Sequence, residues 1–470
     1  MPKKPNIILF ITHDQGQFLG CYNSPQTPNS LHTPNLDNLA ENGVKFVNHF
    51  CTAPQCSPSR GGIQTSKYPH QNGLMGLVNR GWTLPEGNKT IPMYLKEQGY
   101  TTHLIGFQHE ASDPSTLGYD TISKRVFEHQ YSCQMLQSEY FKFLLEHRND
   151  EKPFFLCIGT PEVHRPFIVF GEPVNASNVK IPPYLPDKKK IRKDLAEFYG
   201  AIEAVDGVIG RILKCLDITG LKEDTLFIYT TDHGEAFPRA KCTLYDPGVK
   251  TLLIMSWPHL DLLKGGKKIT CLTSNLDLLP TLLDLIGAEK PETLEGSSFL
   301  PILSDEKKQI HEEIYTEITY HEVYNPIRSI RTNKYKYIRN FEPSNILYIL
   351  PKDIYGDYSG KEMRKRYKSP RPLEEFYDLE KDPLEKVNLI KDPNYSSMIK
   401  SLSQKLINWM ERTNDPLLKG KVLPQKNVAL KFKRIELFES AYLPILKLIQ
   451  NLMRIKGFHK IIRKFIKYIP

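Results

Sequence analysis

The sequence predicts an α/β fold built on a doubly wound sheet, followed by a smaller C-terminal α+β domain. Three observations predict it. Stretches typical of strands and of helices alternate through the first ~300 residues. Several strand-like stretches are continuous apolar runs, the pattern of strands buried on both faces of a parallel sheet. After about residue 310 the stretches become shorter and polar-faced, with turn-rich segments between them, which indicates a second domain.

The first elements have well-marked ends. Residues 6–12 form an apolar run that predicts the first strand. We expect a helix to begin at Pro34, with Thr33 as its cap, and to end at Asn42-Gly43, because proline favours the first helical turn and glycine follows the last. The other predicted elements are a helix at 90–98, strands at 101–105 and 154–159, a helix capped by Asp194 and running to about Leu216, strands at 225–231 and 251–257, and a helix at 275–286.

The rest of the chain divides into two parts. Short strands with a polar face are predicted within residues 328–340 and at 373–379. We therefore expect an α/β domain over residues 1–310, a smaller α+β domain over residues 311–420, and a helical tail over residues 421–470.

The tail carries the net charge of +10. Residues 421–470 hold 12 of the 63 basic residues and 2 of the 53 acidic ones, so the body has no net charge and lacks the positive field expected of a nucleic-acid-binding protein. Apolar residues recur at helical spacing beside a basic face: Phe458, Ile461, Ile462, Phe465, Ile466 and Ile469. Two interpretations stay open. The tail packs on the body or at a dimer interface, or it lies on an anionic membrane surface.

Composition is that of an ordinary globular chain, with 40% apolar and 25% charged residues. No apolar run approaches the ~20 residues needed to span a membrane. The N-terminus leads directly into the first strand, so we expect no cleavable signal peptide. The eight cysteines are scattered without a CxxC pair, which favours a reducing compartment over a disulfide scaffold. We therefore expect a cytoplasmic protein.

Polar side chains follow four predicted strands at the point where each strand ends. They are His13, Asp14 and Gln15 after 6–12, His109 after 101–105, Glu162 and His164 after 154–159, and Asp232 and His233 after 225–231. Ligands of open α/β sheets bind beyond the carboxyl ends of the strands, so these groups are expected to converge. Carboxylates with histidine and amide ligands suit a hard divalent cation.

The most specific motif is Cys56-Ser57-Pro58-Ser59-Arg60, which leads into a predicted helix. A helix N-terminus presents unpaired N–H groups and the positive end of the helix dipole. A cysteine there, with Arg60 one turn on, is expected to have a lowered thiol pKa. A lone cysteine at a helix start is as often a buried structural residue, so the motif alone leaves both interpretations open.

Cys56-x-Pro58-x-Arg60 resembles the signature of the sulfatases, in which the cysteine is oxidised after translation to formylglycine. Further segments within about residues 5–415 resemble the same family: Pro5-Asn6-Ile7-Ile8, Thr33-Pro34-Asn35-Leu36-Asp37-Asn38-Leu39-Ala40, Tyr68-Pro69-His70-Gln71-Asn72-Gly73, Thr230-Thr231-Asp232-His233-Gly234 and Phe376-Tyr377-Asp378-Leu379-Glu380-Lys381-Asp382-Pro383. The resemblance implies an alkaline-phosphatase-like fold and hydrolysis of a sulfate ester or N-sulfate of a sugar. Within the family the chain is most similar to the heparan N-sulfatase (sulfamidase) group, through Tyr320-His321-Glu322-Val323 among other segments.

The resemblance also implies roles for individual residues. The metal ligands would be Asp14, Cys56 in its modified form, Asp232 and His233, holding Ca²⁺ or another divalent cation. The catalytic residues would be Arg60 beside the nucleophile, Lys241 on the transferring sulfate, His164 as proton donor to the leaving atom, and His109 on the hydrated aldehyde. His321 and Glu322 would contact the substrate. The implied partners are a sulfated small molecule or saccharide and the enzyme that forms formylglycine.

Two positions depart from the family pattern. His13 stands where an Asp-Asp pair usually begins, and Phe107 stands where Gly-Lys-x-His has its lysine. Whether His13 ligates the metal or only supports Asp14 stays open.

Two other functions stay open as well. One is a phosphonate or phosphate ester hydrolase of the same fold, which Asp14-Gln15 and Asp232-His233 support. The other is a non-catalytic binder of anionic glycans, which the two departures support.

Overall fold

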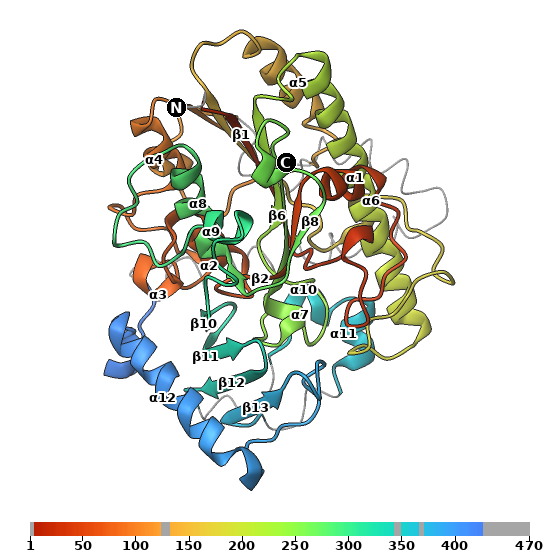
Figure 1. The fold of residues 1–470 in the computed structure, drawn as a ribbon. Coiled ribbons are helices and arrows are strands. Elements are labelled where there is room, and N and C mark those ends of the chain that lie inside the picture. Colours follow the sequence, from red (N-terminus) through yellow and green to blue (C-terminus); the bar gives the residue numbers. More distant parts are fainter. Residues whose placement is uncertain (1–3, 124–131, 343–348, 366–370, 426–470) are drawn as a thin grey trace.

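The computed structural model describes residues 4–123, 132–342, 349–365 and 371–425, which form two sheets (Figure 1). The large sheet has the strand order β4-β3-β5-β1-β6-β7-β2-β8, with β9 beside β2, and the small sheet has the order β10-β11-β12-β13. The strands of the large sheet are β1 (Asn6–Thr12), β2 (Val44–Phe50), β3 (Thr101–Gly106), β4 (Thr121–Ile122), β5 (Phe154–Gly159), β6 (Thr225–Thr231), β7 (Lys250–Ser256), β8 (Lys267–Ile269) and β9 (Thr273–Ser274). Those of the small sheet are β10 (Glu313–Tyr320), β11 (Tyr324–Thr332), β12 (Tyr335–Asn340) and β13 (Glu374–Asp378). The expected fold class is confirmed.

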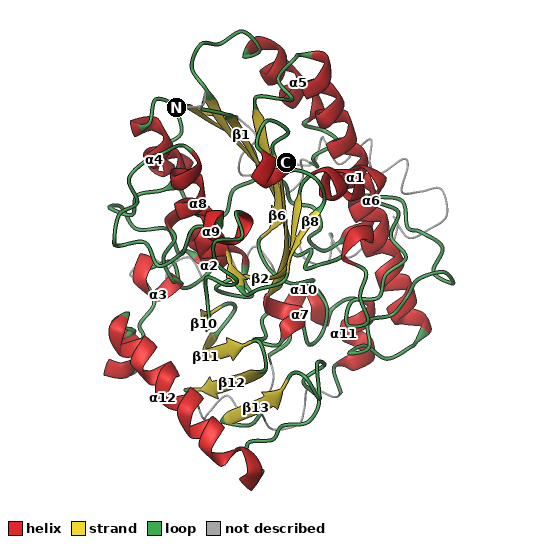
Figure 2. Cartoon of the chain, viewed as in Figure 1, coloured by secondary structure: helices red, strands yellow, loops and turns green. Residues whose placement is uncertain are grey.

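Helices cover both faces of the large sheet (Figure 2). Strand β1 carries apolar side chains on both faces. Ile8 and Phe10 pack in the core on one face of the sheet, and Ile7, Leu9 and Ile11 pack in the core on the other. The helices of the first layer are α1 (Pro34–Asn42), α5 (Gln137–Glu146) and α6 (Lys189–Ile218). Those of the second are α2 (Cys56–Thr65), α4 (Ile91–Glu97), α8 (Leu278–Leu285) and α9 (Leu300–Leu303). Short helices elsewhere are α3 (Pro69–Asn72), α7 (Asp246–Val249), α10 (Lys352–Tyr355) and α11 (Tyr358–Met363).

The centre of the large sheet is parallel. Strand β1 lies between β5 and β6 and runs parallel to both, and β3 runs parallel to β5. The carboxyl ends of these strands therefore meet at one edge of the sheet. Strand β7 runs antiparallel to β6 and to β2, so the sheet is mixed beyond its parallel centre.

The small sheet is antiparallel throughout and packs on helix α12 (Ser396–Arg412). Leu402, Leu406 and Trp409 of the helix share a buried cluster with Ile330 and Tyr337 of the sheet. The connection between β12 and β13 carries α10 and α11, and α11 contacts α6 of the large domain. One segment of the smaller domain thus reaches the body of the molecule.

Most strands predicted from apolar runs are confirmed to within a residue. Helix α6, by contrast, begins at Lys189, so the expected cap Asp194 lies inside it, where its buried carboxylate pairs with Arg165. The predicted helix at 275–286 is a short 3₁₀ turn followed by α8. Strands β2 and β10 were not predicted. The middle of β2 carries polar side chains and a register shift, which obscure the strand pattern.

The amphipathic positions 458–469 lie outside the described residues. Within the described residues, no helix is both long and apolar enough to cross a membrane. All eight cysteines are free thiols.

Candidate active site

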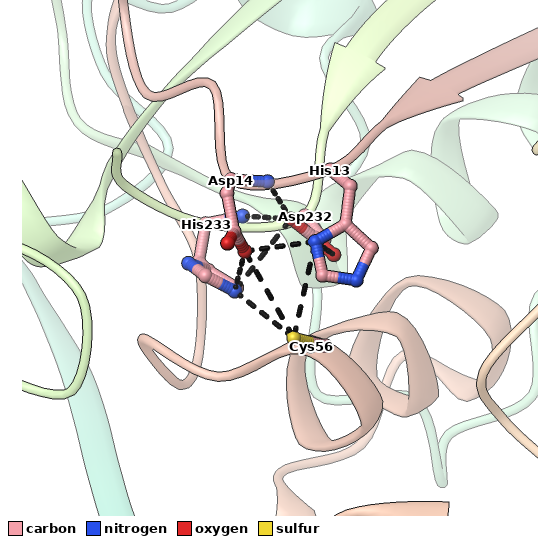
Figure 3. A group of neighbouring side chains, drawn as sticks. All are labelled: His13, Asp14, Cys56, Asp232 and His233. Carbon is pink, nitrogen blue, oxygen red and sulfur yellow. Dashed lines mark hydrogen bonds and ion pairs between the residues drawn. The ribbon is translucent and has the colours of Figure 1, made fainter. Parts of the chain in front are cut away.

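Two neighbouring strands bring the central side chains together. Strand β1 pairs with β6 along its whole length, with Thr12 opposite Thr231. The residues that follow these strands, His13-Asp14 and Asp232-His233, therefore lie side by side (Figure 3). Asp14 turns the chain with a positive φ of 54°, a conformation that aspartate tolerates better than most residues. Its backbone N–H donates to Oδ1 of Asp232 at 2.9 Å.

Cys56 completes the group from the first turn of α2. Its Sγ lies 3.4 Å from Nε2 of His233, 3.9 Å from Oδ1 of Asp14 and 4.0 Å from Nδ1 of His13 (Figure 3). The cysteine is only 3% exposed. The structure therefore brings the residues after β1 and β6 together with the cysteine motif.

These five residues fit a divalent cation. One ligand atom from each of His13, Asp14, Cys56, Asp232 and His233 lies within 4.8 Å of all the others. A cation with bonds of about 2.1–2.4 Å holds its ligand atoms about 3–4 Å apart. Two carboxylates facing two imidazoles therefore supply both the spacing and the donor types that such an ion needs. His13, whose role the sequence left open, belongs to this group.

Neighbouring positive charges keep both carboxylates ionised. Burial alone would raise the pKa of Asp14, but Lys241, His13 and His233 hold it well below its usual range. Burial opposes ionisation of Asp232 in the same way, and His13, His233 and Arg60 bring its pKa down to about 2. Ionised carboxylates are the form that binds a cation.

The lowered thiol pKa expected for Cys56 is wrong. Burial raises this pKa well above its usual value, and the charge of Lys241 only partly offsets the effect. Arg60 is directed elsewhere, since its Nε donates to Asp232 at 3.0 Å and a terminal nitrogen donates to the carbonyl of Thr12 at 3.2 Å. The unmodified thiol is therefore protonated at neutral pH and is not an activated nucleophile.

Lys241 and His164 lie beside the five-residue group. The Lys241 ammonium donates to Oδ2 of Asp14 at 2.6 Å. Nε2 of His164 lies 3.9 Å from the same oxygen. The other ring nitrogen of His164, Nδ1, is 2.6 Å from the carbonyl of Arg165 and must carry the hydrogen of that bond. Nε2 of the neutral ring is therefore an acceptor that points toward Asp14.

Sequence reasoning missed Asp353. It comes from α10, a short helix of the smaller domain, and its Oδ2 lies 3.0 Å from Lys241 and 3.6 Å from Nε2 of His164. Burial would raise its pKa, but Lys241 and then His164 hold it well below its usual range. No strand end or motif in the sequence marks this residue.

The rings of His109 and Phe107 lie near the ring of His13. The His109 ring centroid lies 6.2 Å from that of His13, and the Phe107 centroid lies 5.4 Å from it. Phe107 also stacks on the Arg60 guanidinium, 5.2 Å from the ring centroid. The two positions that depart from the family pattern, 13 and 107, are thus neighbours.

His321 and Glu322 lie in the turn between β10 and β11. Burial, followed by the charge of Lys241, lowers the pKa of His321 to about 3. The Glu322 carboxylate accepts from the backbone N–H of Lys352 at 3.0 Å, next to Asp353. This turn therefore adjoins α10 on the side of the site formed by the smaller domain.

Glu162 does not join the site. Its carboxylate accepts from the backbone N–H of Cys133 at 2.8 Å, and burial raises its pKa to about 7. Gln15 is also turned away, since its side chain bonds to Thr12, Tyr229 and the carbonyl of Phe18.

The family description "Sulfatase" matches residues 5–288, and "N-sulphoglucosamine sulphohydrolase, C-terminal" matches residues 234–371. The chain belongs to the sulfatase family. Members of this family are sulfuric ester hydrolases.

Similar proteins span nearly the whole of this sulfatase. An "ulvan-active sulfatase" of Formosa agariphila is 31% identical over 430 residues, which cover 88% of this chain and 82% of the relative. Human N-sulphoglucosamine sulphohydrolase is 28% identical over 482 residues, covering 89% and 94%. A solved structure described as a complex with its substrate D-glucosamine-2-N,6-O-disulfate shares the fold, with a TM-score of 0.69, 22% identity, and coverage of 88% and 99%.

Proposed function

We propose that this sulfatase hydrolyses a sulfate ester or an N-sulfate of a saccharide, using a formylglycine made from Cys56 and a divalent cation. The observation that carries the proposal is the convergence of Cys56 with two ionised carboxylates and two imidazoles within 4.8 Å. The names of the relatives, which include an ulvan-active sulfatase and a sulphoglucosamine sulphohydrolase, support a sulfated sugar as substrate.

The residues of the site divide the work. Asp14, Asp232, His233 and the modified residue 56 would hold the cation, with His13 as a further donor. When bound, the cation would neutralise charge on the sulfate oxygens, and the hydrated aldehyde at position 56 would supply the attacking hydroxyl. Arg60 fixes Asp232 in place through its 3.0 Å bond.

We assign binding of the sulfate to Lys241, and proton transfer to His164 and His109. The Lys241 ammonium is buried and positively charged, so it would bind the sulfate oxygens that the cation does not reach. Nε2 of His164 accepts a proton and passes it to the leaving atom, while the 2.6 Å bond from Nδ1 keeps the ring oriented. His109, whose ring centroid lies 6.2 Å from that of His13, would take a proton from the hydrated aldehyde.

The mass of one tryptic peptide tests the proposal. The peptide that spans residues 46–60 contains both Cys51 and Cys56. In protein from the native host, position 56 should have lost its sulfur and gained an aldehyde, while Cys51 serves as an unmodified internal control. Unmodified Cys56 in fully active protein would falsify the formylglycine mechanism, and unmodified Cys56 in inactive native protein would favour a glycan binder.

Assays on sulfated sugars and on a phosphonate ester distinguish a sulfatase from a phosphonate hydrolase of the same fold. The structure gives Gln15 a role within the body of the protein rather than in the site. We therefore expect sulfate release from sulfated glucosamines to exceed hydrolysis of an aryl phosphonate. Adding a chelator should abolish turnover, and restoring a divalent cation should recover it.

A further inference from the structure

Asp353 reaches the centre of the site from an unexpected direction. It lies on α10, within the connection between β12 and β13, far in sequence from the strand ends that supply the other residues. Its side chain is 21% exposed, whereas those of Asp14 and Asp232 are fully buried. Asp353 is therefore a carboxylate that both touches Lys241 and remains open to an incoming molecule.

A buried arginine holds this segment against the body. The Arg165 guanidinium donates to both carboxylate oxygens of Asp194 in α6, at 2.7 and 2.8 Å. The same guanidinium lies 3.0 Å from Asp357 and 3.2 Å from the Ser359 hydroxyl, which flank and begin α11. Arg165 follows His164 directly in the chain, so one anchor fixes both His164 and the segment that carries Asp353.

Lys241 does not need Asp353 as a counter-charge. Asp14 already accepts from the Lys241 ammonium at 2.6 Å. A second carboxylate beside the sulfate-binding lysine repels an anionic substrate unless it meets a hydrogen-bond donor there. In the roles proposed above, His164 serves the leaving atom and Lys241 binds the sulfate attached to it. Asp353 lies within 3.6 Å of both residues, beside the bond that breaks.

We propose that Asp353 is a specificity-determining residue, which accepts a hydrogen bond from the leaving nitrogen of an N-sulfated amine. This inference rests on the proposed function. The nitrogen of a sulfamate carries a hydrogen that a carboxylate can accept. The bridging oxygen of a sulfate ester carries none, and it places lone pairs against the Asp353 oxygens.

Hydrolysis of the sulfamate would leave a positively charged product next to Asp353. The N–S bond of the sulfamate breaks, and a new S–O bond forms with the oxygen that water ultimately supplies. Both hydrogens of that water end on the nitrogen, one of them through His164, so the products are sulfate and an alkylammonium ion. The positive product then faces Asp353, which gives it a partner that a neutral alcohol product lacks.

The test compares two sulfates of one sugar. Sulfate release is measured with glucosamine N-sulfate and with glucosamine 6-O-sulfate, for the wild type and for Asp353→Asn, after confirming that residue 56 is equally modified in both proteins. The variant should lose about 10- to 100-fold in kcat/KM on the N-sulfate, the effect of a hydrogen bond to a charged group, and change within about threefold on the O-sulfate. Asp353→Glu should recover part of the loss.

A matched control lies on the same segment. Glu362 of α11 is a partly exposed carboxylate that lies 3.6 Å from Lys190, away from the site. Glu362→Gln should leave both activities unchanged. In the wild type, glucosamine should inhibit at least about tenfold better than N-acetylglucosamine, because only glucosamine offers an ammonium to Asp353.

The outcomes are distinguishable. Equal losses on both sulfates in Asp353→Asn would overturn the inference, as would equal inhibition by the two sugars in the wild type, which needs no variant to fold. A wild-type enzyme that releases only O-sulfate would overturn it while leaving the proposed function intact. Failure to release any sulfate from protein with modified residue 56 would instead overturn the proposed function.

Discussion

The sulfatase contains two buried clusters built from the same residue types, and only one of them is suited to a cation. The first is the five-residue group of Figure 3. The second, the Arg328 cluster, contains His70, Glu317, Arg328 and Asp415 and lies where α3 meets the small sheet. Each cluster has two carboxylates and at least one histidine within metal-binding distance.

The difference lies in what fills the centre. In the Arg328 cluster the guanidinium itself bonds both Asp415 oxygens, at 2.6 and 3.1 Å, while Glu317 accepts from the backbone N–H and Nδ1 of His70. In the five-residue group Arg60 donates to Asp232 and to the Thr12 carbonyl, so Asp14, Cys56 and the two imidazoles still face one point. Ligand spacing alone therefore does not identify a metal site. The position of the arginine decides.

Removing a charged side chain should affect catalysis in the five-residue group and stability in the Arg328 cluster, and the largest effect is expected in the five-residue group. Asp14→Asn should reduce kcat/KM at least about 10³-fold, because it removes several kcal/mol of charge stabilisation by the cation. Its melting temperature without added metal should change little. Elemental analysis should show less bound metal, and a variant with normal activity and metal content would exclude Asp14 from the site.

Arg328→Met should affect stability instead of catalysis. Loss of the guanidinium leaves the buried Asp415 carboxylate without its ion-pair partner and removes the positive charge beside Glu317. This should lower the free energy of unfolding by about 3–5 kcal/mol. The folded fraction should keep a kcat close to that of the wild type. Urea titration with activity measured on the same samples tests this, and Lys334→Met, which breaks only an exposed ion pair with Glu380, is the control.

The neighbouring positions 13 and 107, which depart from the family pattern, allow the charge balance of the five-residue group to be tested. His13→Asp adds a third carboxylate beside Asp14 and Asp232, and Phe107→Lys buries a cation beside Arg60. Each single variant should be destabilised. The double variant should be more stable than the sum of the two predicts, by roughly 0.5–3 kcal/mol. Strict additivity in a double-mutant cycle would show that the two positions are independent.

The smallest effect is a pH dependence of the Arg328 cluster. Burial would raise the pKa of Asp415, but Arg328 holds it below its usual value. This carboxylate therefore stabilises the fold above the unfolded pKa of about 3.9 and loses that contribution as pH falls through the folded pKa. Between pH 7 and pH 3 (roughly), the wild type should lose more stability than Asp415→Asn. Glu411→Gln, on the exposed face of α12, should behave like the wild type.

Sequence patterns predicted much of the five-residue group because its geometry follows from strand pairing. Asp14 and Asp232 each follow a continuous apolar strand, and adjacent parallel strands end together. The cysteine motif lies beside these strand ends because Cys56 is the first residue of helix α2. Lys241 and His164 also lie beside Asp14, and the His109 ring lies near His13. The catalytic roles that the family resemblance implies for these three residues stay predictions.

Other features depend on tertiary contacts that no local pattern records. Asp353 reaches Lys241 because α11 docks on α6 through Arg165, and Asp194, which resembles a helix cap in the sequence, is part of that anchor. The thiol pKa of Cys56 failed as a prediction for a similar reason. The helix start and Arg60 were local signals, whereas complete burial is a property of the whole fold.

The pairing of β12 with β13 has a consequence for how substrate preference can diversify. These strands bond directly, from Tyr335 opposite Asp378 to Arg339 opposite Glu374, so the small sheet is complete without the 341–373 connection that carries Asp353. An exchange of that connection would have to keep an acidic partner for Arg165 and apolar side chains at the positions of Ile354 and Met363, which are buried in the core of the large domain. Grafting the corresponding loop of another sulfatase at this point is therefore a rational route to new specificities.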